Sequence, residues 1–256
     1  MKKFSAILLS VVVLLSLALI FVLGMSLANT KPKTVSPSTA PATKEKVSVD
    51  YSIKSKELLE EYNVIVLNDE KRKVCGGTVI ESSEEAIRVL TAFHCINTDD
   101  EKIIPFGFIK IEEEVYRVEI EHFRRSQDLA LLKVTDSISP LPKAANIGNE
   151  IVYGENVWIV GYGAAEEDII SHGTVAKVNS TSRWSGTHVS IIDGTAYYGN
   201  SGGGIYNEED EIIGVLIEFG PAGPGLWMYA VHVDEVHKLI EEANNLPLSI
   251  SIEFSE

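Results

Sequence analysis

Three residues of this chain could together activate a hydroxyl group for attack on a carbonyl carbon. In chain order they are His94 in Thr-Ala-Phe-His-Cys, Asp128 in Asp-Leu-Ala-Leu-Leu and Ser201 in Gly-Asn-Ser-Gly-Gly. A serine hydroxyl is a poor nucleophile at neutral pH, so it needs an imidazole that accepts its proton. The imidazole in turn needs a carboxylate that fixes its tautomer and stabilises its charged form. The three residue types therefore predict acyl-transfer chemistry through an activated serine.

Glycines surround Ser201 and give the backbone a conformational freedom that other residues lack. A tight turn there would aim the N–H groups of Gly199 and Ser201 at one point, where they could stabilise the oxyanion of a tetrahedral intermediate. Taken alone, this segment could be an ordinary glycine-rich turn, and Asp128 an ordinary acidic residue before a strand. We interpret the other histidines as surface or ordinary strand and helix positions; they are His122, His172, His188, His232 and His237.

The three motifs, in the order His, Asp, Ser, resemble those of the trypsin-like (chymotrypsin-fold) serine proteases. That family has Thr-Ala-x-His-Cys around its histidine and Asp-Ile-Ala-Leu-Leu from its aspartate onward. The resemblance implies that Ser201 attacks the scissile carbonyl, that His94 accepts and returns the proton, and that Asp128 orients His94. It also implies a protein or peptide substrate, and neither a metal ion nor a cofactor.

Asn200 departs from the pattern of trypsin and its digestive relatives, which have an aspartate there that pairs with a released N-terminus. An uncharged Asn cannot hold an ammonium group, and no Ile-Val-Gly-Gly activation sequence precedes Val64. We therefore expect activity without proteolytic release of an N-terminus. The Asn form, together with residues 193–201, most resembles bacterial HtrA/DegP-type proteases. The likeness covers most of residues 64–240, and we expect no peptide-binding PDZ domain after it.

The resemblance also suggests where a substrate would bind. By the family's spacing Thr195 lies at the base of the specificity pocket, and a neutral base favours small or medium apolar side chains. Glu218 is an argument for a basic side chain instead. The substrate is expected to add as a strand alongside a short segment near the site. That segment consists of Ile217, Glu218, Phe219 and Gly220.

The chain has two cysteines, Cys75 and Cys95, and the second directly follows His94. In trypsin-like proteases a disulfide often joins these two places, so the resemblance implies a Cys75–Cys95 bridge. Two unpaired buried thiols are the alternative. A zinc site is a weaker interpretation, because His94 already has a role and no fourth ligand is evident.

From about residue 56 the sequence consists of short β-branched runs separated by turn residues, which predicts an all-β sandwich or barrel. A short helical turn over residues 92–96 would present His94, and residues 234–245 have helical spacing behind an expected Asp234 cap. The resemblance implies two six-stranded antiparallel β-barrels with a C-terminal helix. The predicted strands cover residues 64–67, 74–80, 87–91, 115–121, 129–134, 157–160, 174–178, 188–192, 203–206, 212–217 and 227–231.

The first 28 residues predict a targeting segment. Lys2 and Lys3 precede an uncharged apolar run over residues 4–23, and Ser26 and Ala28 fit a signal-peptidase site. The run is also long enough to span a bilayer, so a cleaved signal and an uncleaved membrane anchor both remain open. Either one takes the protein out of the cytoplasm. We expect a flexible Thr/Pro/Ser/Lys-rich linker at 29–55, a protease domain at 56–247 and an acidic tail at 248–256.

The formal charge is −15, and it is concentrated after the N-terminal region. From Asp50 onward there are 16 basic and 36 acidic residues, a balance of −20. Such a surface repels phosphate backbones, so nucleic acid is not an expected partner.

The sequence therefore favours an exported serine endopeptidase. Two other function classes fit the same residues. One is a latent or chaperone-like binding module whose triad is held in a collapsed geometry, with the glycine-rich residues 220–225 as a mobile loop. The other is a serine hydrolase that acts on esters, because acyl-enzyme chemistry does not separate esters from peptides.

Overall fold

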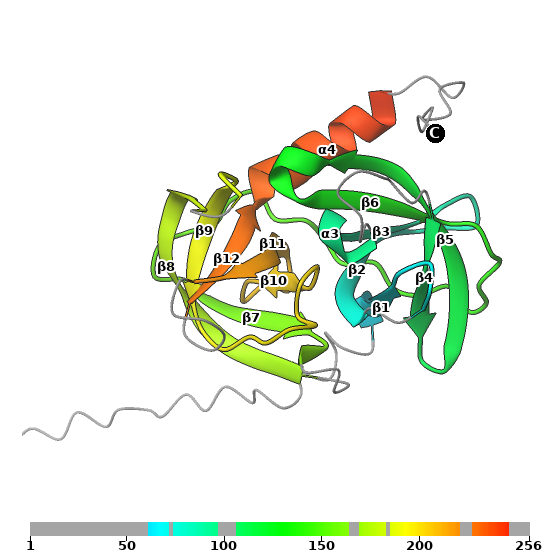
Figure 1. The fold of residues 1–256 in the computed structure, drawn as a ribbon, viewed down its shortest axis with the longest axis horizontal. Helices are drawn as coiled ribbons and strands as arrows, with labels where there is room; N and C mark the ends of the chain where they lie inside the picture. The colour runs from blue at the N-terminus through cyan, green and yellow to red at the C-terminus, as the bar shows by residue number, and fades with distance from the viewer. Residues whose placement is uncertain are drawn as a thin grey trace, which may run out of the picture. The chain divides into compact units, whose positions relative to one another are not determined.

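The computed structural model describes residues 61–71, 74–96, 106–163, 169–182, 185–220 and 227–245. The expected targeting segment, linker and acidic tail lie outside these residues, as does most of the glycine-rich segment at 220–225. β-strands dominate the described residues, and one long helix lies near the C-terminus (Figure 1). The elements are β1 (Asn63–Leu67), β2 (Val74–Ser82), β3 (Ile87–Ala92), α3 (Phe93–Ile96), β4 (Phe106–Ile111), β5 (Glu114–Arg124), η1 (Arg125–Gln127), β6 (Leu129–Val134), β7 (Asn156–Gly161), β8 (Ile169–Thr181), β9 (His188–Asp193), β10 (Gly204–Tyr206), β11 (Ile212–Phe219), β12 (Trp227–His232) and α4 (Val233–Asn245).

The strands form two closed six-stranded barrels. The first runs β1-β2-β3-β6-β5-β4 and the second runs β10-β11-β12-β9-β8-β7, with every ladder antiparallel. The barrels lie side by side, and α4 extends from the second barrel over the first (Figure 1). This confirms the predicted fold class.

Alternation along the strands explains how each barrel obtains its core. Side chains of a strand point alternately to its two faces, so an apolar residue at every second position fills the barrel interior. Fully burying one aliphatic side chain contributes about 1.5–3 kcal/mol to folding relative to leaving it exposed. Buried side chains of the first barrel include Val66, Val89, Ile109, Val118 and Leu132, and those of the second include Val157, Ile159, Val175, Ile192 and Ile205.

Each of the eleven predicted strands corresponds to a strand of the structure, but β4 was not predicted. Its sequence, Phe-Gly-Phe-Ile-Lys-Ile, carries a glycine that reads as a turn signal. A Cβ at Gly107 would lie 2.8 Å from the carbonyl oxygen of Leu67, so this glycine permits the close approach of β1 and β4. The missing strand is the one that closes the first barrel.

The C-terminal helix begins one residue before the predicted start. Asp234 therefore lies in the first turn of α4, and the prediction that it caps the helix is wrong. The ring Nδ1 of His232 accepts a hydrogen bond from the Asp234 N–H at 3.3 Å, so a histidine occupies the capping place. The helix has 13 residues, and no helix of the described part of the chain is long and apolar enough to cross a membrane.

A buried polar cluster joins the two barrels. The hydroxyl of Tyr206 in β10 donates to Asn63 Oδ1 in β1 at 3.0 Å, and it lies 3.0 Å from Thr78 Oγ1 in β2. Burial raises the pKa of the Tyr206 phenol, which keeps it protonated as a donor. Buried hydrogen bonds of this kind fix how the two barrels pack, because breaking them would leave unpaired polar groups.

Candidate active site

His94 lies in α3, the single helical turn that follows β3, as the sequence predicted. Two contacts hold the turn in place. The N–H of Phe93 donates to the carbonyl oxygen of Asp128 at 3.0 Å, and the Phe93 ring stacks on that of Phe123 at a centroid distance of 4.8 Å. The backbone that carries the imidazole is thereby bonded to the backbone that carries the carboxylate.

Two hydrogen bonds join His94 to the Asp128 carboxylate. The backbone N–H of His94 donates to Asp128 Oδ1 at 2.9 Å, and ring Nδ1 lies 2.6 Å from Oδ2. Because its neighbour is a carboxylate oxygen, Nδ1 carries a proton, which leaves Nε2 as the acceptor. The Asp128 side chain is 18% exposed and that of His94 is 37% exposed, so the carboxylate is shielded while the imidazole reaches solvent.

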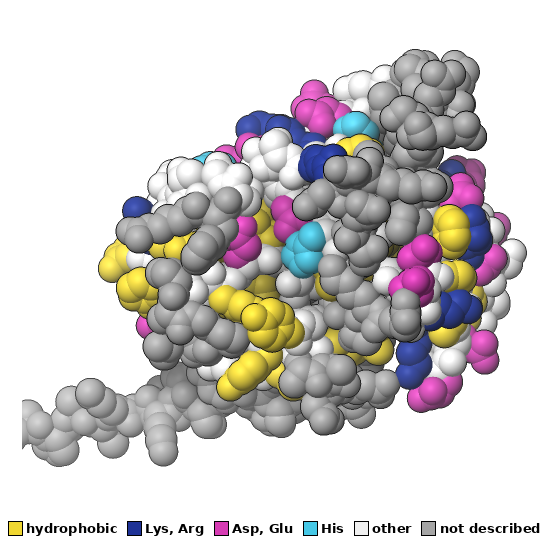
Figure 2. Space-filling model, viewed as in Figure 1, with side chains coloured by type: hydrophobic (Ala, Val, Ile, Leu, Met, Phe, Trp, Pro, Cys, Tyr) yellow, Lys and Arg dark blue, Asp and Glu magenta, His cyan; other side chains and the backbone are white. Residues whose placement is uncertain are grey.

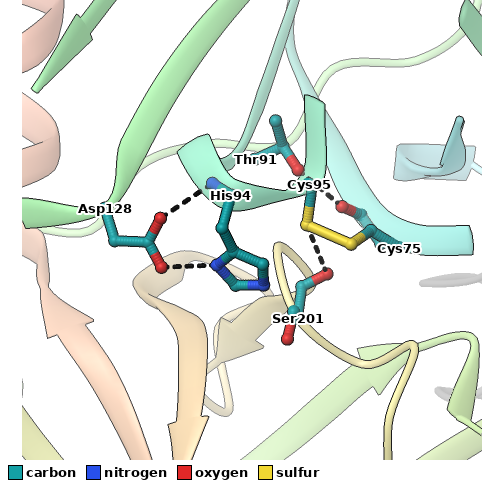
Figure 3. The surroundings of a disulfide bond; sticks show 7 residues. Cys75, Thr91, His94, Cys95, Asp128 and Ser201 are labelled. Carbon is teal, nitrogen blue, oxygen red and sulfur yellow. Dashed lines mark hydrogen bonds and ion pairs between the residues drawn. A yellow bond between two sulfur atoms is a disulfide. The ribbon is translucent and has the colours of Figure 1, made fainter. Parts of the chain in front are cut away.

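Ser201 lies in the turn between β9 and β10, in the second barrel, and faces His94. Figure 3 shows the His94 ring between Asp128 and Ser201. Within the described residues no hydrogen bond joins the Ser201 hydroxyl to His94. Catalytic hydrogen bonds of unliganded enzymes are often long and tighten only when substrate binds. The carboxylate–imidazole pair is thus formed, whereas the imidazole–hydroxyl contact is not yet made.

Backbone contacts hold the Ser201 turn. The carbonyl oxygen of Ser201 accepts a hydrogen bond from the N–H of Gly76 at 2.8 Å. Gly199 and Gly202 have φ values of +102° and +81°, which L side chains rarely adopt. A Cβ at Gly76 would lie 2.8 Å from the backbone of Gly203, so these two segments of the chain are in direct backbone contact. Glycine is therefore required on both sides of this crossing.

The N–H groups of Gly199 and Ser201 lie on the turn that carries the serine. Neither group donates to a protein acceptor within the described part of the chain. A hydrogen bond from the Tyr162 N–H to the Gly199 carbonyl oxygen, at 3.4 Å, restrains the peptide that precedes Asn200. An oxyanion hole needs two such donors aimed at one point.

Asn200 is almost fully buried beneath this turn, with 1% of its surface exposed. Its Oδ1 accepts a hydrogen bond from the N–H of Tyr197 at 3.0 Å. A Cβ at Gly161 would lie 2.8 Å from the Asn200 Cα, so β7 packs closely against the turn. The Asn200 side chain therefore joins two residues of the same turn, Asn200 and Tyr197.

Cys75 and Cys95 form a disulfide with a Cα–Cα distance of 5.9 Å. The alternative of two unpaired thiols is thus wrong. The two sulfurs and the His94 ring lie close together, but disulfide sulfurs carry no thiolate for a metal ion. Cys95 adjoins His94 (Figure 3), and Cys75 adjoins Gly76, whose N–H donates to the Ser201 carbonyl oxygen. The bridge therefore links the supports of the imidazole and of the serine.

The predicted substrate-binding residues lie in two segments. Ile217, Glu218 and Phe219 end β11, where the Gly220 N–H donates to the Trp227 carbonyl oxygen at 2.7 Å. The Glu218 carboxylate accepts a hydrogen bond from the Ser182 hydroxyl. Thr195 is exposed in the segment after β9, where its carbonyl oxygen accepts from Ser171. No described contact brings Thr195 to His94 or Ser201.

Two exposed aromatic residues, Tyr198 and Trp227, were not predicted as part of the site, whereas Phe219 was. Tyr198, directly before Gly199, is 75% exposed, and its ring meets that of Phe219 edge to face at 5.4 Å. Trp227 is 51% exposed. On the face shown in Figure 2, hydrophobic side chains gather beside a histidine near the middle of the surface. The Tyr-Tyr pair before Gly-Asn-Ser was the only sequence signal for this feature.

The comparisons with known proteins agree with this geometry. The trypsin-like peptidase domain family matches residues 75–215, a range that contains His94, Asp128 and Ser201. The fold and the matched range define a serine endopeptidase of trypsin-like type. The chain belongs to the family of trypsin-like peptidase domains.

The chain is similar to two proteins described as "Serine protease HtrA-like", from Staphylococcus aureus strains MRSA252 and bovine RF122 / ET3-1. The identities are 25% and 26% over 185 residues. Each match covers 66% of this chain but 23% of the relative, so the chain spans about a quarter of the length of these relatives.

Among solved structures, the chain is similar to the serine endoprotease from Yersinia pestis. The TM-score is 0.61 with 20% sequence identity, and the match covers 77% of this chain and 68% of that one. At this identity the likeness concerns the fold.

Proposed function

We propose that this protein is an exported serine endopeptidase that hydrolyses peptide bonds through His94, Asp128 and Ser201, without activation by a released N-terminus. The observation that carries the proposal is the doubly hydrogen-bonded His94–Asp128 pair facing Ser201. These three residues come from separate segments and meet in one place. A structural role for an aspartate and a histidine would not require a glycine-flanked serine beside the imidazole.

The chemistry follows from the geometry. Nε2 of His94 takes the proton of the Ser201 hydroxyl as its oxygen bonds to the scissile carbonyl carbon. The carbonyl oxygen becomes an oxyanion, which the N–H groups of Gly199 and Ser201 stabilise. His94 then gives the proton to the leaving amine, and the C–N bond breaks. Water repeats the same steps on the acyl-enzyme and regenerates Ser201, while Asp128 holds the imidazole and stabilises its positive charge.

The hydrogen bond from the Tyr197 N–H to Asn200 supports activity without a zymogen step. The Asn200 amide is uncharged, and its contact lies within the turn that carries Gly199 and Ser201. Ordering of the turn therefore needs no ammonium group from another part of the chain.

A peptide substrate has room to add as a strand at the end of β11. The pairing of β10 with β11 ends at Val215, and the Leu216 backbone still bonds to Gly202 and Gly203 at 2.7 and 3.0 Å. Beyond Leu216 no described strand pairs with this edge of β11. An extended peptide could take up the backbone groups of this edge. The aromatic rings of Tyr198 and Phe219 beside it favour an apolar side chain in the substrate.

Export is proposed from the N-terminal sequence and the disulfide. The apolar run behind Lys2 and Lys3 has the composition of a targeting segment, and disulfides persist mainly outside the cytoplasm. A cleaved signal would release the protein, and an uncleaved one would tether it to the membrane. The mature N-terminus, read by Edman degradation or mass spectrometry, distinguishes these outcomes.

The test is active-site labelling with a fluorophosphonate, followed by cleavage of a diverse peptide library. We expect labelling and cleavage by the purified protein, and a loss of about 10⁶-fold in kcat in Ser201→Ala, since nucleophile and base act as one unit. Ser137→Ala, at an exposed position in another loop, serves as the control. Cleavage of esters without matched amides would identify an esterase, and a folded protein that takes no label would identify a latent or binding module.

A further inference from the structure

The long helix of the second half of the chain packs on the first barrel. α4 follows β12 directly but contacts β5 and β6, the strands on either side of Asp128 (Figure 1). Its apolar face, with Val236 and Leu239 fully buried, belongs to a core cluster that contains side chains of both barrels. The helix is thus a direct mechanical connection between the two halves of the molecule.

Arg124, the last residue of β5, carries the polar part of this connection. Its Nη1 donates to Glu242 Oε1 at 3.1 Å, and its Nη2 lies 3.1 Å from Glu235 Oε2. The Glu235 side chain is only 7% exposed, and that of Arg124 is 21% exposed. Lys238 also pairs with Glu235, at 2.7 Å, and His122 lies 3.2 Å from Glu242. One guanidinium therefore bridges the first turn and a later turn of α4.

The turn that follows Arg124 presents the carboxylate of the active site. η1 (Arg125–Gln127) ends at Asp128, which has a left-handed backbone conformation of φ 53°, ψ 40°. An L-residue adopts such a conformation at an energetic cost, which the contacts around the turn must offset. Within the turn, the Asp128 N–H donates to the Arg125 carbonyl oxygen at 3.1 Å.

A residue of the second barrel holds the same turn from the other side. The hydroxyl of Thr187, which is fully buried, donates to the carbonyl oxygen of Ser126 at 3.1 Å. The four residues from Arg124 to Gln127 thus have one anchor on α4 and one on the segment before β9. Both anchors lie in the half of the chain that carries Ser201.

We propose that Arg124 and Thr187 are positioning residues for Asp128, through which α4 and the second barrel set the orientation of the carboxylate toward His94. This inference rests on the proposed function. Neither residue touches a reacting atom; they act by holding the turn whose backbone conformation aims Asp128. A displacement of about 1 Å in such a constellation can lower the rate about 100-fold.

The test uses two variants that weaken the anchors without leaving a buried charge. Arg124→Gln combined with Glu235→Gln removes both members of the ion pair, because a single change would leave an uncompensated charge. Thr187→Val keeps the shape of the side chain and removes the donor. Arg117→Gln is the control, since Arg117 lies on the same strand in an exposed pair with Glu119 at 3.8 Å.

We expect kcat to fall about 10- to 100-fold in the anchor variants, with KM unchanged within about twofold, and no change in the control. The ring Nδ1–H of His94, observed as a downfield proton resonance, should move upfield as its bond to Asp128 lengthens. A purely structural role would lower the melting temperature without changing either observable.

Folded anchor variants with unchanged kcat and an unchanged His94 resonance would overturn the inference. If the double variant does not fold, Thr187→Val and Glu242→Gln decide the question, since Glu242 is half exposed and its neutral form leaves no orphan charge. Absence of fluorophosphonate labelling in the unaltered protein would refute the proposed function instead. The His94 resonance would still report whether the anchors set the carboxylate.

Discussion

The two barrels support their parts of the site in different ways. In the first barrel, side-chain contacts hold the site: Asp128 accepts two hydrogen bonds from His94, Phe93 stacks on Phe123, and Cys95 forms a disulfide with Cys75. In the second barrel, the Ser201 turn depends on backbone contacts and on glycines that allow close approach. The imidazole and carboxylate therefore need particular functional groups, whereas the serine turn needs the absence of side chains.

This difference predicts two kinds of effect when residues of the site are substituted. Changing a side chain in the first barrel should alter the chemistry of a folded protein. Adding a side chain at the serine turn should alter the fold of the turn itself. The predictions below test this division, beginning with the largest expected effect.

The sharpest test adds one methyl group at the serine turn. In Gly202→Ala the new Cβ would overlap the Gly76 carbonyl oxygen and the Thr91 hydroxyl, at a φ of +81°. We expect a loss of about 4 kcal/mol in the free energy of unfolding, from overlap and backbone strain together. Urea unfolding measures it.

Gly186→Ala is the matched control for this change. Gly186 has a φ of +74°, but no atom lies within 4 Å of the position of its Cβ. It should therefore lose only the strain contribution, about 1 kcal/mol. Equal losses at the two positions would show that the backbone crossing does not restrict the serine turn.

The disulfide provides the next test. It belongs to the first barrel, but Cys75 adjoins Gly76, whose N–H binds the Ser201 turn of the second barrel. Reduction should lower the free energy of unfolding by about 2–4 kcal/mol. For a domain of this size that corresponds to a fall of roughly 2–4 °C in Tm per kcal/mol. Calorimetry with and without a reductant measures the change, with Cys75→Ser/Cys95→Ser as a control insensitive to reductant. An unchanged Tm would mean that the bridge adds nothing to stability.

The smallest effect concerns His232, which stacks on His188 at a centroid distance of 5.3 Å. Burial lowers the pKa of His232 below its usual 6.5, and the neighbouring His188 lowers it further, although Asp234 opposes both. The unfolded chain then binds the proton more readily than the folded one. The contribution of the neutral, buried His232 to the free energy of unfolding is complete above pH 6.5. It declines as the pH falls below that value and is lost below the pKa of His232 in the folded protein.

This pH dependence can be measured as urea unfolding between about pH 7.5 and pH 5. The wild-type protein should lose stability over this range more steeply than His232→Phe, in which the buried group cannot take up a proton. Parallel slopes would assign the pH dependence to other groups.

The fold was largely predictable, and so was the approach of His94, Asp128 and Ser201 to one another, because short motifs carry them. The apolar run in Leu-Ala-Leu-Leu-Lys-Val predicted β6 with its observed bounds, and the helical turn at His94 lies where the sequence predicted it. These features depend on near neighbours in the chain. The missing strand β4 shows the limit, because Gly107 breaks the local pattern and serves a contact with the distant Leu67.

The supports of the site were not predictable, because their partners are far apart in sequence. Nothing near Arg124 indicates that it pairs with Glu235 and Glu242, more than a hundred residues later. Gly76 and Ser201 are likewise distant, and only the packing of the barrels brings the N–H of one to the carbonyl of the other. Periodicity and motifs identify elements and chemistry, whereas the contacts between the barrels depend on how they dock.

The backbone crossing of Gly76 with Gly202 and Gly203 also fixes the spacing of the two barrels beside the site. The barrels meet there without intervening side chains, so no change of side-chain rotamer can alter that spacing. If one barrel rotated against the other about this point, displacement would grow with distance from it. Ser201 would then move less relative to Cys75 than parts of the barrels farther from the crossing.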